Sequence, residues 1–322
     1  MTDFAVDQPP AGELPHAIEP ERSGRGNRRA RAARSAPQVR RAPLSPARVA
    51  VVATVGGVTA LAFWFVLYAL VLSGLQESHT QRLLYAQLRY NLAQATVPLG
   101  GKIAPGTPVA NLIAPTIGMQ AVVVEGTSSS DLAKGPGHLP DTPMPGQAGN
   151  AEIYGRSAMF GAPFSRVHDL RPGAIIGVTT GQGTFGFRVI DVRGPGDPEP
   201  SAGKLGPSSL TLVTSAGSGW RSGWAPNHVI FADATLVSGT VQPAPPGRPA
   251  AVPAADKPLA GDTSELVLVV FELEALVLLG GGLAWAGTRW TTGQAWLVGL
   301  PAILAMLWVT TSTAILLLPN LA

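Results

Sequence analysis

The residue with the clearest chemical potential closes a short apolar run. Leu210 to Ser215 reads Leu-Thr-Leu-Val-Thr-Ser, and the 322-residue chain contains no cysteine, so a thiolate nucleophile is excluded. A thiol ionises at a pH of about 8.5, whereas a serine hydroxyl needs a neighbouring general base to take its proton. Ser215 is therefore a candidate nucleophile only if such a base lies beside it.

The histidines show no spacing that would bind a metal. They are distant from one another and lack the close pairing of zinc ligands: His16, His79, His138, His168 and His228. Cysteine ligands are absent as well. The chain carries no phosphate-binding loop signature. We therefore expect neither a metal nor a cofactor.

Several segments of the central region follow one another in an order that resembles the sortases. These are cell-surface transpeptidases whose thiolate attacks a peptide bond of a sorting signal. The run at 210–215 resembles their Thr-Leu-x-Thr-Cys strand. Gly-Pro-Gly-His-Leu-Pro at 135–140, Pro-Gly-Gln-Ala-Gly-Asn at 145–150 and Gly-Ala-Pro-Phe at 161–164 resemble further family segments. The resemblance extends from about Val97 to Val237 and implies the family's closed β-barrel.

All three positions that match the family's catalytic residues are substituted. Arg156 follows Ala-Glu-Ile-Tyr-Gly, where the family has its catalytic histidine, and Ser215 takes the place of the cysteine. His228, within Pro-Asn-His-Val-Ile-Phe at 226–231, matches the catalytic arginine, although a one-residue shift would put Asn227 there. The resemblance therefore implies a sortase-like protein that lacks cysteine transpeptidase activity.

Two interpretations of these three side chains remain open. The Arg156 guanidinium stays protonated and offers donors but no acceptor, so it cannot be the general base. His228 could accept a proton, which would give a permuted site with a Ser215 and His228 dyad and Arg156 as oxyanion donor. In the other interpretation, which we favour, all three are polar residues that line a former groove.

Three more residues are candidates for contact with a ligand in the groove. His138 belongs to the segment at 135–140, and we expect a structural or groove-lining role rather than catalysis. Trp220 and Trp224 lie between Ser215 and His228 in the sequence. They could stack on a ligand, dip toward the membrane interface or pack against the domain, and we expect packing first.

The central region has the pattern of a mainly β domain. Two apolar runs, Ala174–Thr180 and Thr184–Ile190, are joined across Gly-Gln-Gly at 181–183, which predicts a hairpin. Many short strands separated by Gly and Pro indicate a closed barrel or a sandwich. Composition does not choose between the two, but the resemblance to sortases implies a barrel, which we place at 97–238.

Three segments are long and apolar enough to cross a membrane. Val49–Leu72 carries no charge and exceeds the roughly 20 residues that a span needs. It is too long, and begins too late, for a cleaved signal peptide. Leu266–Trp285 and Ala295–Leu318 follow near the end of the sequence, where a buried soluble helix pair is the alternative. We predict transmembrane helices on both sides of the barrel, at 49–73, 264–287 and 294–318.

Two further segments connect the spans to the barrel. Leu84, Leu88 and Leu92 recur every four residues and form one helical face, which predicts a juxtamembrane helix at 76–96. This helix would pack on the domain or stand as a stalk. Residues 239–262 are rich in Pro, Ala and Gly without an apolar period, so we predict a linker.

The stretch at 1–48 is strongly basic. No acidic residue lies between its first and last arginine, and the arginines are Arg22, Arg25, Arg28, Arg29, Arg31, Arg34, Arg40, Arg41 and Arg48. Such an excess is typical of the cytoplasmic flank of a span. We therefore predict a disordered cytoplasmic tail and an extracytoplasmic barrel in a multi-pass protein of the cell membrane. Anionic lipid headgroups are the expected partner of the tail, and nucleic acid is not.

Two carboxylates fall within the second predicted span. Glu272 and Glu274 lie about 9 to 12 Å along the helix from Leu266, at about 1.5 Å per residue. A carboxylate at that depth costs up to a few kcal/mol unless it is neutral or paired. Either the span begins later, with both groups near the headgroups, or Glu272 faces another helix or a partner membrane protein while Glu274 points elsewhere.

Three hypotheses about function follow. The first is a membrane-anchored, extracytoplasmic pseudoenzyme that serves as a binding or scaffold component of the bacterial cell envelope or cell wall, with a surface peptide or envelope protein as partner. The second is a serine-based acyl transferase or hydrolase on the same barrel. The third is an accessory subunit of a membrane complex. The reactivity of Ser215 distinguishes the second hypothesis from the other two.

Overall fold

A computed structural model of the chain describes residues 45–216, 226–261, 263–289 and 292–322. By its internal contacts the chain divides into Met1–Thr54 and Val55–Ala322, and all eight strands belong to the second unit. Residues 1–44, with eight of the nine arginines of the basic stretch at 1–48, lie outside the described residues. The disorder of the tail therefore stays a prediction.

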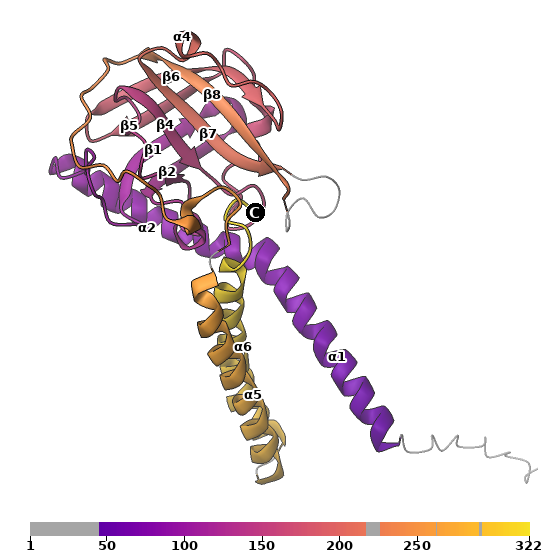
Figure 1. Cartoon of the computed structure of the whole chain (residues 1–322). Helices are drawn as coiled ribbons and strands as arrows, with labels where there is room; N and C mark the ends of the chain where they lie inside the picture. Colours follow the sequence, from indigo (N-terminus) through magenta and orange to yellow (C-terminus); the bar gives the residue numbers. More distant parts are fainter. Residues whose placement is uncertain (1–44, 217–225, 262, 290–291) are drawn as a thin grey trace, which may run out of the picture. The chain divides into compact units, whose positions relative to one another are not determined.

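Eight strands of the described part form a closed barrel in the order β1-β2-β3-β4-β7-β8-β6-β5 (Figure 1). Most neighbours are antiparallel, but β2 with β3 and β4 with β7 are parallel pairs. The strands are β1 (Pro108–Ala114), β2 (Met119–Glu125), β3 (Gly137–His138), β4 (Gly149–Tyr154), β5 (Ile175–Thr180), β6 (Gly183–Arg193), β7 (Ser208–Ala216) and β8 (His228–Ser238). The predicted closed barrel is confirmed.

The predicted hairpin joins β5 to β6. The two strands are antiparallel, and Thr180 lies opposite Gly183 across the turn. A Cβ atom on Gly181 would lie 2.7 Å from a methyl group of Leu99 and 3.0 Å from Cβ of Val97. The segment that enters the barrel therefore passes so close to this turn that a side chain at Gly181 does not fit.

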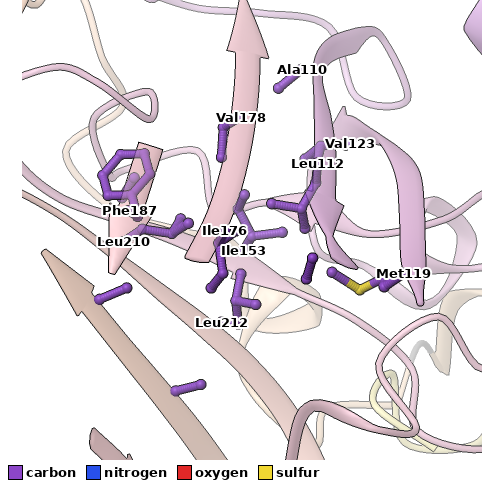
Figure 2. Packing of buried hydrophobic residues seen from close by; sticks show 14 of the residues in the cluster. Ala110, Leu112, Met119, Val123, Ile153, Ile176, Val178, Phe187, Leu210 and Leu212 are labelled. Atoms are coloured by element: carbon purple, nitrogen blue, oxygen red, sulfur yellow. The ribbon is translucent and has the colours of Figure 1, made fainter. Parts of the chain in front are cut away.

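The two faces of β7 have different surroundings. Leu210 and Leu212 are fully buried in the barrel core, where they pack with Ile153 (Figure 2). Val213 belongs instead to a separate apolar cluster. Because successive side chains of a strand point to opposite faces, Ser215 shares the outer face with Val213. One face of the strand thus packs in the barrel core, and the other face is buried outside the barrel.

A continuous helical segment precedes the barrel. It consists of α1 (Pro46–Leu67), one π-helical turn η1 (Tyr68–Leu72) and α2 (Ser73–Ala93). Leu84 and Leu88 of α2 are buried against Val122 and Val124 of β2. The leucine face predicted from the sequence therefore packs on the barrel, as expected for a helix that docks on the domain and does not stand free as a stalk.

Two long helices follow the barrel, α5 (Leu266–Arg289) and α6 (Thr292–Leu316), and they lie side by side (Figure 1). Helices long and apolar enough to cross a membrane cover Thr54–Ala93, Thr263–Arg289 and Trp296–Leu316. Apolar helices thus lie on both sides of the barrel in the sequence, as predicted.

Glu272 is buried against α6, whereas Glu274 is exposed. The hydroxyl of Thr313 in α6 donates a hydrogen bond to Glu272 Oε1, with an oxygen to oxygen distance of 3.0 Å. Glu272 therefore faces a second helix, whereas Glu274 does not.

The segment between β8 and α5 lies along the barrel. Gln242 bridges to Gln147, and Val252 and Leu259 pack in the outer cluster that contains Val213. This segment and the loops also hold short helical turns: η2 (Pro115–Ile117), α3 (Ser129–Leu132), η3 (Val167–Asp169), α4 (Ala202–Leu205), η5 (Ala254–Asp256) and η6 (Thr263–Glu265). The Pro, Ala and Gly composition is therefore compatible with an extended segment held by many contacts.

Candidate functional site: a filled groove at the ends of β4 and β7

The parallel pair β4 and β7 brings two of the candidate residues together. Tyr154 lies opposite Val213, and the amide of Gly155 donates to the Val213 carbonyl at 2.9 Å. The residues just beyond Tyr154, among them Arg156, therefore lie beside Ser215. A Cβ atom on Gly155 would meet the ring of Phe164 at 2.4 Å, so this close turn requires glycine.

Ser215 is almost completely buried, with 4% of its surface exposed. Its hydroxyl donates a hydrogen bond to the carbonyl oxygen of Leu321 at 2.6 Å. A second hydroxyl, that of Ser157, lies 2.9 Å from Ser215 Oγ and 3.2 Å from the same carbonyl oxygen. The amide of Ser157 also donates to this oxygen, at 3.1 Å. Three donors therefore converge on one peptide carbonyl. We use the word groove for the positions of Arg156, Ser157 and Ser215 around the main chain of Leu321 and Ala322.

Arg156 is fully buried, and its side-chain hydrogen bonds go to two main-chain oxygen atoms. Its Nη1 donates to the main-chain oxygen of Ala322 at 3.2 Å and its Nη2 to the carbonyl of Ser129 at 3.0 Å. The guanidinium carbon lies 4.9 Å from the ring centroid of Phe160. Burial lowers the pKa of Arg156 to about 9, so the group still carries its charge at neutral pH.

His228 does not join this site. In the antiparallel pair of β7 and β8 it lies opposite Ala216, while Ser215 lies opposite Val229. Directly opposed residues project to the same face, and successive residues to opposite faces. The His228 side chain therefore leaves the sheet on the face opposite to Ser215, and it is exposed. The described geometry does not assemble the Ser215 and His228 dyad.

His138 has its own set of partners away from Ser215. Its Nδ1 lies 2.9 Å from Glu125 Oε2 and its Nε2 lies 3.0 Å from the carbonyl oxygen of Pro143. The side chain is 2% exposed. These contacts tie β3 to β2 and to the loop before β4, which is a structural role. Trp220 and Trp224 lie outside the described residues.

The described residues supply the site with several hydrogen-bond donors and with no general base. Among the described residues, no histidine, aspartate or glutamate contacts Ser215, and burial raises the pKa of nearby Tyr154 above its ordinary value. A nucleophile must direct a lone pair at the carbonyl carbon, whereas Ser215 directs its proton at the carbonyl oxygen. This arrangement binds a peptide carbonyl but does not activate the hydroxyl that would attack it. The described residues also contain no cluster of metal-binding side chains.

Sequence reasoning missed two participants, Ser157 and Leu321. Ser157 immediately follows a matched position, so its closeness to Ser215 could have been inferred from the parallel pairing of the two strands. Leu321 had no such signal, because it lies 106 residues beyond Ser215 in sequence and follows a predicted span. Only the folded chain brings its carbonyl to the groove.

A family model supports the assignment of the barrel. The family model of the sortase domain matches residues 112–235. Among solved structures, a sortase transpeptidase of Clostridium perfringens is 19% identical (TM-score 0.40) over 50% of this chain and 99% of its own. A mutant of sortase E from Streptomyces avermitilis is 28% identical, with a TM-score of 0.35, over 42% of this chain and 91% of its own. Sortase A from Corynebacterium diphtheriae is 20% identical, with a TM-score of 0.34, over 52% of this chain and 92% of its own.

No match was found among curated proteins. The match to the family model spans β-strands from β1 to β8 and includes Arg156, Ser215 and His228. The barrel, through residues 112–235, therefore matches a sortase domain, in a chain that has no cysteine.

Proposed function

We propose that this chain is a membrane-anchored pseudoenzyme of the sortase family that binds a partner in the cell envelope and does not transfer peptides. The observation that carries the proposal is the hydrogen bond from Ser215 to a peptide carbonyl, at a site where no described residue contacts Ser215 as a base. The groove keeps donors suited to the oxygen atoms of a peptide main chain. The partner class is therefore a surface peptide or an exposed segment of an envelope protein.

The charges and contacts of the chain support a particular placement in the membrane. We propose a cytoplasmic N-terminus, because arginine excess marks the inner flank of a first span. The barrel is then outside, and α5 and α6 form a hairpin whose connection near Arg289 is inside. The contact of Ser215 with Leu321 supports this topology, since two crossings return the chain to the side of the barrel. The tail would meet anionic lipid headgroups.

The helices offer a second contact for a partner. Glu272 Oε2 is buried without a hydrogen-bond partner among the described residues, while Oε1 is occupied by Thr313. A buried acceptor without a donor costs about 1 to 3 kcal/mol. A donor from another membrane protein at this position would remove that cost, which supports Glu272 as a contact within a membrane complex.

Reactivity of Ser215 is the test that separates binding from catalysis. We expect the full chain in detergent to remain unlabelled by a serine-directed acylating probe, because no described residue is placed to take the proton of Ser215. Matched controls are Ser215→Ala and His228→Ala. Labelling of the wild type that both substitutions abolish would refute the proposal and would support a serine acyl transferase or hydrolase with a dyad formed by a rearranged His228.

Substitutions toward the family pattern test the same proposal from the other side. We expect Ser215→Cys alone to leave cleavage of sorting-type peptides undetectable, because proton transfer by a positioned side chain contributes typically about 100- to 10,000-fold. The combined variant Arg156→His, Ser215→Cys and His228→Arg supplies all three groups. Activity in the combined variant, but not in the single one, agrees with loss of catalysis by substitution. Activity in Ser215→Cys alone would contradict it.

A further inference from the structure

Residues 320–322, which follow α6, are buried in the protein. Pro319 cannot continue a helix, and the amide of Ala322 donates to the Pro319 carbonyl at 2.9 Å to close a turn. Asn320, Leu321 and Ala322 are then completely buried, at 0% exposure each. Four residues that follow a long apolar helix are thus packed into the barrel domain, beside the ends of β7 and β8 (Figure 1). We call Pro319–Ala322 the C-terminal segment.

Asn320 joins the C-terminal segment to two distant parts of the chain. Its side-chain amide donates to the carbonyls of Thr127, at 2.8 Å, and Lys257, at 3.0 Å. Its backbone amide donates to the carbonyl of Ala260 at 2.8 Å. One side chain therefore connects the loop after β2 with the segment that precedes α5. These bonds fix the position of Asn320, which immediately precedes Leu321, the residue whose carbonyl accepts from Ser215.

Leu321 fills the groove with both its side chain and its main chain. The side chain packs in the outer cluster with Leu132, Leu139, Tyr154 and Val213. The carbonyl oxygen receives the hydroxyl of Ser215 and the two donors of Ser157. An apolar pocket and a cradle of donors thus meet at a single residue, which is the pattern of a bound peptide ligand.

Ala322 completes the contact at the buried arginine. Its main-chain oxygen accepts from Arg156, and its side chain packs with Met159, Phe160 and Tyr68. If the C-terminal segment left the groove, Arg156 and Ser215 would each lose a main-chain acceptor. The freed groups would turn to water or to the oxygen atoms of another ligand.

We propose that Pro319–Ala322 is an intramolecular ligand that fills and blocks the groove of this sortase domain. An external partner then gains access to Ser215 and Arg156 only when the C-terminal segment leaves. A tethered ligand acts at an effective concentration of roughly millimolar or more, so a free competitor must bind well to displace it. Because the segment continues directly from α6, a movement of that helix changes whether the groove is open. This inference rests on the proposed binding function of the groove.

The test uses single cysteines in the full chain, which has no native thiol. We would measure the rate at which a small maleimide labels Ser215→Cys in detergent, with and without deletion of Pro319–Ala322. We expect the deletion to raise the rate at least tenfold, because the C-terminal segment covers a residue that is 4% exposed. Ala322→Cys in the undeleted chain should react at least tenfold more slowly than the exposed control Ser201→Cys.

A buried control keeps the result interpretable if the deletion unfolds the barrel. Ala234→Cys lies in the barrel core at 0% exposure and should stay protected in both backgrounds. Faster labelling of Ser215→Cys with Ala234→Cys still protected supports the inference. Equal rates for Ser215→Cys in the two backgrounds, or an Ala322→Cys that reacts as fast as Ser201→Cys, would overturn it.

A second variant, which keeps the whole chain, tests the inference even if the deletion variant unfolds. Asn320→Ala removes the side-chain hydrogen bonds of the C-terminal segment and should also speed labelling of Ser215→Cys while Ala234→Cys stays protected. If Asn320→Ala leaves the rate at Ser215→Cys unchanged, the inference fails. Failure here leaves the proposed absence of catalysis untouched, since that is tested with the acylating probe.

Discussion

The substitution Arg156→Met tests whether the buried guanidinium stabilises the fold. Burial lowers its pKa from 12.5 to about 9. At about 1.4 kcal/mol for each pKa unit, keeping the charge costs about 5 kcal/mol at neutral pH. Its two hydrogen bonds to main-chain oxygens return about 1.5 to 3 kcal/mol each, as bonds to charged groups do. The terms nearly cancel, so we expect Arg156→Met to change the free energy of unfolding by less than about 2 kcal/mol.

Arg156→Lys is the contrasting variant. It keeps a buried charge but lacks the planar fork that reaches two acceptors, so we expect it to be less stable than Arg156→Met. Burial should lower the pKa of the lysine in the folded state below the unfolded value of about 10.4. The unfolded state then binds more protons, and the stability of Arg156→Lys should rise with pH through that window.

Thermal unfolding of the full chain in detergent, followed by circular dichroism at pH 7 and pH 9, measures both variants. A shift of about 2 to 4 °C corresponds to about 1 kcal/mol for a domain of this size. A loss of more than about 4 kcal/mol in Arg156→Met would refute the near cancellation. So would a lysine variant that is at least as stable as the methionine variant at pH 7.

Three further predictions concern packing, topology and the helices. Leu88→Ala should lower the free energy of unfolding by about 2 to 5 kcal/mol, because the Leu88 side chain is only 1% exposed. The control Leu83→Ala, at a side chain that is 60% exposed, should change the free energy of unfolding by less than about 0.5 kcal/mol. Thermal unfolding measures both variants. A membrane-impermeant maleimide should label Ser201→Cys in intact cells and Thr288→Cys only after lysis; the reverse pattern would contradict the topology. Glu272→Gln keeps an acceptor for α6 and should accumulate in membranes better than Glu272→Leu; equal accumulation would show that the hydrogen bond is dispensable.

The barrel could be predicted because its segments carry short-range signals. The hairpin of β5 and β6 is marked by Gly-Gln-Gly, and the leucine face of α2 by its period of four. These patterns depend on neighbours within a few residues, where turn chemistry and side-chain direction decide the outcome. The order of the sortase-like segments then selected a barrel over a sandwich.

The site was less predictable, since its geometry depends on strand register and on distant contacts. Whether His228 reaches Ser215 depends on which residue of β8 lies opposite Ser215, and a shift of one residue would reverse the face. The occupation of the groove by Leu321 depends on a contact between residues separated by two helices. No local pattern in the apolar residues after α6 indicates where they pack.

The three-way contact of Thr127 with Asp256 and Asn320 also sets an order for folding during synthesis. Thr127 donates to Asp256 through its amide and hydroxyl, and its carbonyl accepts from Asn320. At about 5 to 20 residues per second, the chain from the end of β8 to Ala322 takes roughly 4 to 17 s to make. The residues of all eight strands have been synthesised before that interval begins. A nascent barrel can therefore close while its groove is still vacant. A partner that meets the chain during translation would encounter a site that the finished protein conceals.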